Sequence, residues 1–366
     1  MIKQKFPCGI CLKNVRESQP SILCNNCNFY VHITCSEVSP SEYKTLADEP
    51  DEVPWFCKKC TIADRESIFP FGTVENEILS DLFELDKPSV VDSLPSFEIT
   101  SHLTNLPNLQ DYDIDEQLPS NIDSNYVSIQ DLSSTDTNHT DLSFLHMNIR
   151  SLSCHFDELQ TLLVNLKVPF DVVAVSETWD SFKRPLKVNV EIPGYTFFST
   201  RSQSQNGGVG LYIKSSLAPI PRSDLASDSD DFETVWTEVE NPKDKNILIC
   251  CAYRHPNSDP ETFNEYIQNI LANPTITNKN VFILGDFNLN LLNYDSHTPT
   301  KNFVSLFLSQ HFLPFVVHPT RVSDHSSTII DNIFSNICNL ETKSGNILTH
   351  IADHFPPFLI VKKAGI

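Results

Sequence analysis

Cysteine and histidine residues occur in closely spaced pairs through the first sixty residues, and these pairs constrain the fold more than any other feature. Seven of the eleven cysteines lie there with one histidine, in the order Cys8, Cys11, Cys24, Cys27, His32, Cys35, Cys57 and Cys60. Each pair is separated by two residues, so that one turn can present two ligand atoms to one ion. Thiolate and imidazole suit zinc, and eight ligands complete two tetrahedral sites. We therefore predict two structural zinc ions, which supply folding energy that so short a segment cannot obtain from a buried core.

Acidic residues are concentrated in the middle of the chain. Of the net charge of −21 carried by the 366 residues, −15 falls on residues 61–141, which hold seventeen acidic and two basic side chains. The stretch has one glycine, no tryptophan and no sustained apolar periodicity. We interpret 63–141 as a disordered acidic linker between a zinc-binding domain at 1–62 and a second domain at 142–366. An irregular extension packed on a neighbouring domain is the alternative.

The chain from Leu142 onward alternates short apolar runs with amphipathic stretches, which is typical of an α/β domain. The predicted strands are 142–147, 171–176, 210–213, 246–253, 280–284 and 358–362. The predicted helices are 156–166, 260–271 and 302–311.

Polar residues follow several of these predicted strands, where α/β folds place their active sites. One carboxylate at such a point is often only a helix cap, but six positions in succession indicate a site. The residues are Asn148, Glu177, Tyr253 with Arg254, Asp286 with Asn288, Asp331, and Asp353 with His354. Four of the nine glycines, Gly207, Gly208, Gly210 and Gly285, lie in two short stretches of this domain, where close backbone approach is expected.

The ligand order of the first sixty residues, with histidine fifth, resembles that of the PHD finger. Trp55, two residues before Cys57, strengthens the resemblance. It implies interleaved pairing, in which one zinc is held by Cys8, Cys11, His32 and Cys35 and the other by Cys24, Cys27, Cys57 and Cys60. Pairing in sequence order is the alternative that spacing alone leaves open.

Many PHD fingers bind the histone H3 tail as an added strand and seat a methyl-lysine against aromatic side chains. In this sequence the corresponding strand is Ser21–Leu23, and Tyr30 stands where such fingers often carry tryptophan. The resemblance therefore makes Tyr30 a candidate contact for a histone tail. Packing of Tyr30 and Phe29 in the small core is the alternative.

The residues that follow the predicted strands resemble the endonuclease/exonuclease/phosphatase superfamily, through Gly285-Asp286-Phe287-Asn288, Ser176-Glu177-Thr178 and Asp353-His354. The resemblance implies a DNase I-like four-layer α/β sandwich, with two packed mixed sheets flanked by helices. The pieces at 148–152, 253–256 and 318–321 are most similar to the endonucleases of LINE-type non-LTR retrotransposons, some of which carry an upstream PHD finger. A reverse transcriptase is absent from this sequence, so it resembles a truncated element product or a gene derived from one.

This resemblance, with the chemistry of the residue types, assigns roles in phosphodiester hydrolysis. Glu177 is expected to bind Mg²⁺, with Asp353 as a further ligand or a support for the metal. Asp286 is expected to orient or deprotonate the attacking water, while His354, held in one tautomer by Asp331, meets the phosphate or transfers a proton. Asn148, Asn288 and Tyr253 are expected to complete the phosphate site.

Three arginines are candidate substrate contacts: Arg150, Arg254 and Arg321. Relatives that cleave at abasic sites commonly carry an acid where this chain has Arg150, which favours contact with a nucleic-acid phosphate over a metal ligand. A surface salt bridge is an equally good interpretation of Arg150.

The function predicted from the sequence is a Mg²⁺-dependent DNA endonuclease tethered to a PHD finger, located in the nucleus or otherwise in the cytoplasm. No apolar run is long enough to span a membrane, and no secretory signal precedes Cys8, so we expect neither membrane binding nor secretion. The alternatives are an inactive chromatin or protein interaction factor, and a phosphatase acting on another phosphoester such as a phosphoinositide.

Overall fold

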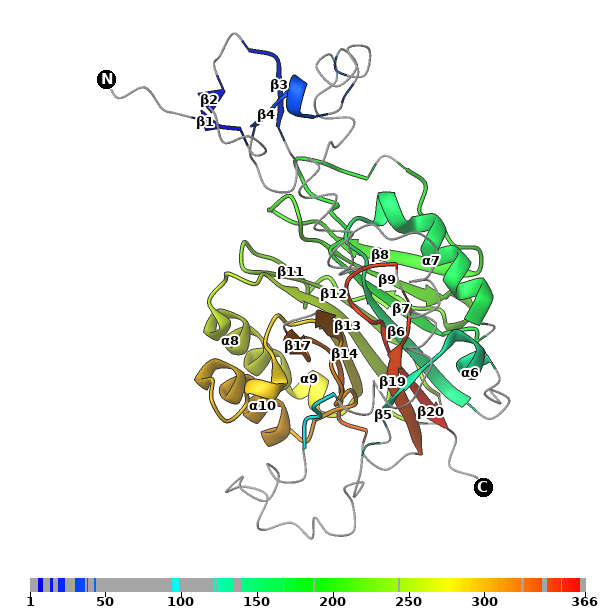
Figure 1. The fold of residues 1–366 in the computed structure, drawn as a ribbon. Helices are drawn as coiled ribbons and strands as arrows, with labels where there is room; N and C mark the ends of the chain where they lie inside the picture. The colour runs from blue at the N-terminus through cyan, green and yellow to red at the C-terminus, as the bar shows by residue number, and fades with distance from the viewer. Residues whose placement is uncertain are drawn as a thin grey trace. The chain divides into compact units, whose positions relative to one another are not determined.

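The chain folds into two compact units, residues 1–76 and 77–366, in a computed structural model (Figure 1). The structure describes residues 6–8, 14–15, 19–23, 30–36, 38, 43, 94–98, 122, 124–133, 140–166, 168–186, 188–242, 244–323, 326–337, 341–349 and 351–362. In this part of the chain no helix is both long and apolar enough to cross a membrane.

Two short antiparallel strand pairs form the described framework of the N-terminal unit. β1 (Phe6–Pro7) pairs with β2 (Asn14–Val15), and β3 (Ser21–Leu23) pairs with β4 (Tyr30–His32). The 3-10 turn η1 (Ile33–Cys35) follows β4 directly. The buried apolar side chains described here are Cys8, Val15, Ile22 and Val31.

The C-terminal unit contains two seven-stranded mixed sheets and two small outlying strands, β16 (Arg321–Ser323) and β17 (Ser326–Thr328). The first sheet has the order β5 (Ser124–Val127), β19 (Thr342–Ile347), β20 (Pro357–Lys362), β6 (Thr140–Asn148), β7 (Val172–Ser176), β9 (Val209–Lys214) and β8 (Tyr195–Thr200). The second has the order β10 (Ile220–Pro221), β12 (Phe232–Val239), β13 (Ile247–Arg254), β14 (Asn280–Asp286), β18 (Asp331–Ser335) and β15 (Leu313–Pro314), with β11 (Ser227–Asp228) also paired to β12.

Alternate residues of the central strands serve the two faces of each sheet. In β7, Val172 and Ala174 join the core shared with the second sheet, whereas Val173 and Val175 join the core beneath the helix on the outer face. Between the sheets, Phe144 of β6 stacks on Phe282 of β14 with ring centroids 4.1 Å apart. A strand buried on both faces explains why β7 is apolar from Val172 to Val175.

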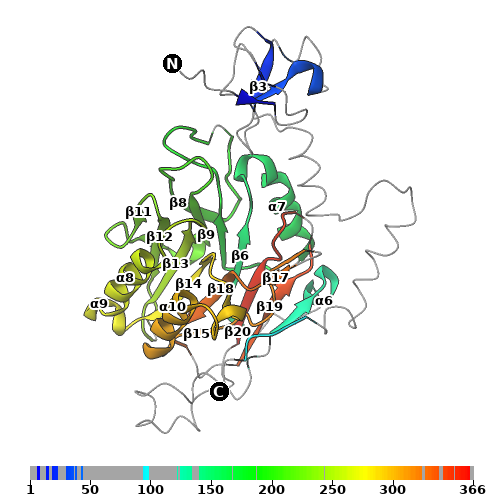
Figure 2. The same cartoon turned by 60° about the vertical axis from the view of Figure 1, so that its left-hand side comes forward.

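Helices cover the outer face of each sheet (Figure 2). On the first sheet lie α7 (Leu152–Leu166) and the short α6 (Ile129–Ser133). On the second lie α8 (Pro260–Leu271), α9 (Pro274–Thr277) and α10 (Thr298–Ser309). The start of α8 is set by Asp259, which accepts a hydrogen bond from the Glu261 N–H, and by Pro260 in the first turn. The predicted four-layer sandwich is confirmed, and the fold is DNase I-like.

Two parts of the predicted linker belong to the C-terminal unit. Residues 124–127 form β5, parallel to β19, and Leu132 of α6 is buried against α7. Phe97 is also buried, and its N–H donates to the Val317 carbonyl at 2.8 Å. A linker continuous to residue 141 is therefore wrong at 94–98 and 124–133, because pairing with distant segments orders residues that lack a local pattern. Residues 140 and 141 begin β6 and residue 122 is also described, whereas the rest of the predicted linker lies outside the described residues.

Candidate active site

Side chains from both sheets meet at one end of the sandwich. In the second sheet, Tyr253, Asp286 and Asp331 are register partners on three neighbouring strands. In the first sheet, Asn148 ends β6 opposite Ser176 of β7. Register partners point to the same face of a sheet, so each row presents its side chains together.

Asn148 joins the two rows. Its Nδ2 donates to Oε1 of Glu177 and to Oδ2 of Asp286, both at 2.9 Å, and its side chain is buried. Asn148 therefore donates one amide hydrogen to each of two carboxylates that come from different sheets. We predicted that Asn148 donates to a phosphate oxygen. The structure instead makes it the residue that holds Glu177 and Asp286 at a fixed separation.

Glu177 lies in a turn with unfavourable backbone geometry. Its φ is +50° and that of Trp179 is +55°, in the left-handed region that residues other than glycine rarely adopt. The half-buried carboxylate accepts hydrogen bonds from the Tyr253 hydroxyl at 3.1 Å and from Trp179 Nε1 at 3.4 Å, besides that from Asn148. The contacts orient both oxygens and compensate for the strained turn.

His354 lies against Asp331 with its Nδ1 at 2.8 Å from Oδ2. The same oxygen accepts from Thr320 Oγ1 at 2.6 Å. Because the carboxylate can only accept, His354 Nδ1 carries a hydrogen, and its Nε2 is directed away from Asp331. This arrangement matches the pairing predicted from the sequence.

Sequence reasoning missed His146 in this group. It is fully buried, its Nε2 is 3.1 Å from Ser176 Oγ and its Nδ1 is 3.6 Å from Oδ1 of Asp331. His146 stands two residues before Asn148 in the same strand. The two-residue period of a strand was therefore the signal that placed it on the face of the site.

Asn288 and Arg254 hold the turn that follows Asp286. The Asn288 N–H donates to Oδ1 of Asp286 at 3.0 Å, and Asn288 Nδ2 donates to the Arg254 carbonyl at 2.7 Å. The Arg254 guanidinium donates to the carbonyls of Phe287, Asn288 and Ser258 at 2.7 to 2.9 Å, and the residue is 2% exposed. The prediction that Arg254 binds substrate is therefore corrected, because its donors are used inside the fold to fix the turn.

Asp353 lies between two arginines. Its Oδ2 is 2.7 Å from the Arg321 guanidinium and its Oδ1 is 3.6 Å from that of Arg150. Burial raises the pKa of Asp353, but the charges of His354, Arg150 and Arg321 outweigh it and lower the pKa below the usual value. A carboxylate neutralised in this way is poorly suited to bind a metal, so the geometry favours Glu177 over Asp353 as the Mg²⁺ ligand.

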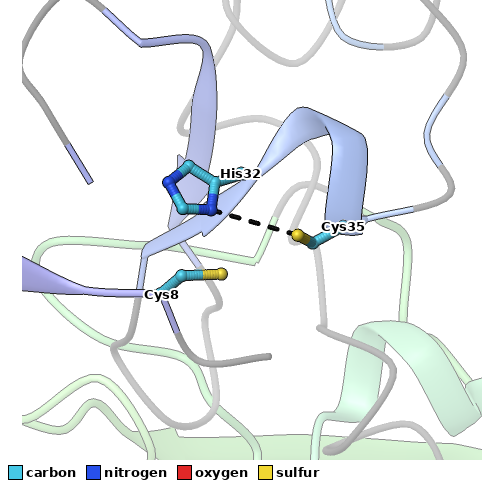
Figure 3. A group of neighbouring side chains, drawn as sticks. All are labelled: Cys8, His32 and Cys35. Atoms are coloured by element: carbon cyan, nitrogen blue, oxygen red, sulfur yellow. Dashed lines mark hydrogen bonds between the residues drawn. The ribbon is translucent and has the colours of Figure 1, made fainter. Parts of the chain in front are cut away.

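Cys8, His32 and Cys35 converge in the N-terminal unit (Figure 3). Their ligand atoms lie within 4.8 Å of one another, and Cys35 Sγ is 3.9 Å from His32 Nδ1. Two thiols and an imidazole at such distances fit a tetrahedral zinc ion. The other predicted ligands, Cys11, Cys24, Cys27, Cys57 and Cys60, lie outside the described residues.

Comparison with the sequence models of protein families identifies both units. Residues 145–354, more than half of the chain, match the Endonuclease/Exonuclease/phosphatase family. The chain belongs to this family. Residues 5–64 match the Pygopus PHD-type zinc finger, so a PHD finger precedes the endonuclease/exonuclease/phosphatase domain.

The solved structures that are similar to the chain share little sequence with it. A family protein from Leptotrichia buccalis is 17% identical with a TM-score of 0.47, and the match covers 61% of this chain and all of that one. The AP endonuclease LMAP from Leishmania major is 12% identical, with a TM-score of 0.48 and coverages of 72% and 99%. The endonuclease domain of TRAS1, a telomere-specific non-LTR retrotransposon, is 12% identical, with a TM-score of 0.45 and coverages of 60% and 98%. No curated protein matches the chain in a sequence search.

The buried Asp286, Asp331 and His354 group is consistent with an active site of an endonuclease/exonuclease/phosphatase hydrolase. Burial raises the pKa of Asp286 to about 8, together with the negative charges of Asp331 and Glu177. Burial lowers the pKa of His354, but the charge and hydrogen bond of Asp331 outweigh it and raise the pKa to about 9. At neutral pH His354 therefore carries a proton, and Asp286 is far more basic than an ordinary carboxyl group, so that its ionised form, which can accept a proton from water, becomes more abundant as the pH rises toward 8.

Glu177 fits a divalent metal ion such as Mg²⁺. Mg²⁺ prefers one or two carboxylates and keeps several waters. Both Glu177 oxygens are oriented by uncharged donors, and in the described part of the chain this carboxylate makes no ion pair with a basic side chain. When bound there, the ion would polarise a phosphate oxygen and make a bound water more acidic.

Proposed function

We propose that this protein is a Mg²⁺-dependent endonuclease that nicks DNA and is tethered to a zinc-binding PHD finger. The observation that carries the proposal is the hydrogen-bonded path from Glu177 through Asn148 to Asp286, beside the Asp331–His354 pair. This geometry supports a metal ligand, a general base and a cationic hydrogen-bond donor acting around one phosphate.

In the proposed reaction, water attacks the phosphorus and gives its proton to Asp286, and the P–O bond on the opposite side breaks. His354 stays protonated and donates from Nε2 to a phosphate oxygen, while Asp331 balances its charge and fixes its tautomer. Asn148 and Asn288 keep Asp286 aimed at the water, and Tyr253 orients Glu177. The leaving oxygen takes its proton from solvent.

DNA is the proposed substrate for two reasons. Arg150 and Arg321 lie on either side of Asp353, next to His354, and the Arg321 side chain is half exposed. The exposed part of the Arg321 guanidinium presents planar donors that suit the phosphates of a nucleic-acid backbone. A PHD finger in the same chain also suits work on chromatin, and we propose that the protein acts in the nucleus.

Nicking of supercoiled plasmid by the full chain tests this function. We expect nicking that rises with added Mg²⁺ and is absent without it, and that Asp286→Ala abolishes in a preparation made identically. If the wild-type chain leaves plasmid intact but releases phosphate from a phosphoinositide, the phosphatase alternative replaces the nuclease. Inactivity on both would favour the interaction factor.

The convergence of Cys8, His32 and Cys35 supports interleaved zinc pairing over pairing in sequence order. In the interleaved order, Cys11 completes this site, and Cys24, Cys27, Cys57 and Cys60 form the second. We place the finger within residues 1–62. We extend the hydrolase unit N-terminally beyond residue 142 to include residues 94–98 and 124–133, which pack on it.

Binding of a histone H3 tail is a second proposed activity, supported by the position of Tyr30. Its side chain is 39% exposed on β4, and β4 pairs with the predicted docking strand β3. Titration of H3 peptides with and without lysine methylation should show binding that Tyr30→Ala weakens. Equal binding by the variant would leave Tyr30 as a packing residue.

A further inference from the structure

Glu233 of β12 is a buried carboxylate that the proposed reaction does not use. It is the register partner of Tyr253, so it continues the row formed by Tyr253, Asp286 and Asp331. Its Oε1 accepts from the Ser202 hydroxyl and lies 2.9 Å from His255 Nε2. Its Oε2 is buried without a hydrogen-bond partner. A carboxylate buried at this cost needs a reason beyond packing.

Ser202 connects Glu233 to the segment that follows Glu177. The Ser202 N–H donates to the Asp180 carbonyl at 2.9 Å, and the Ser202 carbonyl accepts from the Phe182 N–H at 3.2 Å. Its hydroxyl, which is fully buried, is the group that donates to Glu233. One serine thus ties the segment after Glu177 to a fixed strand of the second sheet.

The glycines beside Ser202 hold the turn at a second point. The Thr178 N–H donates to the Gly208 carbonyl at 3.1 Å, and the Trp179 N–H donates to the Gly207 carbonyl at 2.8 Å. A Cβ added at Gly207 would lie 2.7 and 2.9 Å from the two carboxylate oxygens of Glu233. Glycine is therefore required where this loop crosses the carboxylate, and the loop lies directly against Glu233.

The strained turn needs such support. Glu177 and Trp179 both have positive φ, and such conformations persist only where surrounding contacts fix them. The hydrogen bonds to Gly207, Gly208 and Ser202 fix this turn from one side, and the Ser151 N–H donates to the Glu177 carbonyl from the other at 2.8 Å. Glu233 holds the loop that supplies the first set.

We propose that Glu233 is a positioning residue that, through Ser202, fixes the turn carrying Glu177 and thereby sets the affinity of the site for Mg²⁺. The proposal rests on the proposed role of Glu177 as the metal ligand. Glu233 itself touches neither metal nor substrate. It acts on the geometry of a ligand that must be held in a strained conformation.

Three variants of the full chain test this role: Glu233→Ala, Glu233→Gln and, as a control, Glu238→Ala. Gln keeps an acceptor for Ser202 and His255, whereas Ala removes it. Glu238 is a buried carboxylate near the opposite end of β12, where it accepts from Arg222, Lys279 and Asn246. Its loss removes comparable polar contacts from the same strand but none from the Glu177 turn.

The first readout is amide hydrogen exchange without Mg²⁺. In Glu233→Ala, peptides covering 177–182 and 200–208 should exchange about tenfold faster or more, because the loop loses its attachment. Glu233→Gln should stay close to the wild type, and Glu238→Ala should leave these peptides unchanged. Equal acceleration in both alanine variants, or none in Glu233→Ala, would overturn the proposal.

The second readout is the Mg²⁺ dependence, measured by calorimetric binding and by nicking. In Glu233→Ala, the Mg²⁺ concentration for half-saturation should rise by about 10- to 100-fold, as for the loss of other groups that orient a metal ligand. Maximal turnover at saturating Mg²⁺ should fall much less. If binding shifts as expected but no variant nicks DNA, the role of Glu233 stands and the nuclease proposal fails. An unchanged Mg²⁺ affinity in Glu233→Ala would refute the positioning role of Glu233, whether or not the variant nicks DNA.

Discussion

The two units are stabilised in different ways, and the metal has a different role in each. In the described part of the PHD finger, a few buried apolar side chains accompany strands of two or three residues, and three ligand side chains converge. The endonuclease/exonuclease/phosphatase domain instead has two extensive apolar cores, one between its sheets and one beneath α7. Its candidate metal ligand, Glu177, lies at one end of the sandwich. Zinc should therefore be part of the fold of the finger, whereas Mg²⁺ should be part of the reaction in the domain.

Metal removal should produce the largest difference between the two units. Stripping metal with a chelator should expose the amides of residues 1–60 to rapid exchange, because bound zinc supplies on the order of 10 kcal/mol to such a finger. β13 and β14 should remain protected. Loss of protection in both units together would contradict the comparison.

A single ligand substitution sharpens the same point. Metal analysis should find two zinc ions per wild-type chain and about one in Cys8→Ser. Cys154→Ser is the matched control, because Cys154 is an exposed cysteine of α7 and its loss should leave the zinc content unchanged. One zinc or none in the wild type would exclude the two-site finger.

The next largest effect is expected in the active site. Asp286→Ala and His354→Ala should each lower turnover by roughly 10²- to 10⁴-fold, because each removes a proton acceptor or a donor to the phosphate. The double variant should lose less than the product of the single losses, since both groups act on one transition state. Asp295→Ala, at an exposed position, should match the wild type. Unchanged nicking by Asp286→Ala would refute the site.

Stability should respond to Asp286 in the direction opposite to activity. The pKa of this carboxyl is about 8 in the folded chain and near 4 when unfolded. Between these two pH values the unfolded chain has lost the proton while the folded chain still holds it, so raising the pH favours the unfolded state. The amount by which Asp286 lowers the free energy of unfolding therefore grows as the pH rises from 4 to 8. Asp286→Asn should raise the melting temperature of the domain by several degrees at pH 8 and by less at pH 5. A larger gain at pH 5 would contradict the assigned environment.

The smallest expected effect belongs to the rim of the site. Arg321→Ala should weaken DNA binding a few-fold and reduce the slope of log affinity against log salt by about one. Stability should change by less than about 1 kcal/mol, because the Arg321–Asp353 pair is partly exposed. Arg222→Ala, which breaks ion pairs with Asp224 and Glu238, should leave the salt slope unchanged.

The sequence was most informative where one residue type has one common use. The eight-ligand spacing predicted a PHD-type finger, and the apolar runs predicted the central strands. The predicted helix at 260–271 coincides with α8, because Asp259 and Pro260 signal its start locally. Gly285 was expected to mark a close approach, and a Cβ there would lie 2.0 Å from the Ala252 carbonyl oxygen.

Local patterns could not reveal contacts between distant segments. β5 and β12 were missed, since β5 is ordered by its pairing with β19 and the buried face of β12 includes Glu233 and Thr237. For Asn148 and Arg254 the residue types were noticed, but their partners come from remote strands and turns. A side chain that could meet phosphate can equally be used to hold a catalytic group, and only the three-dimensional arrangement distinguishes the two.

The pairing of β5 with β19 has a consequence for how the hydrolase unit can be cut. β5 covers the outer side of β19 from Ser344 to Ile347. A fragment starting at residue 142 would lack β5 and would leave the backbone of β19 with unpaired N–H and C=O groups at the edge of the first sheet. Exposed edge strands of this kind pair with strands from other molecules. A fragment of this kind should therefore self-associate, and one that begins before Phe97 should stay monodisperse.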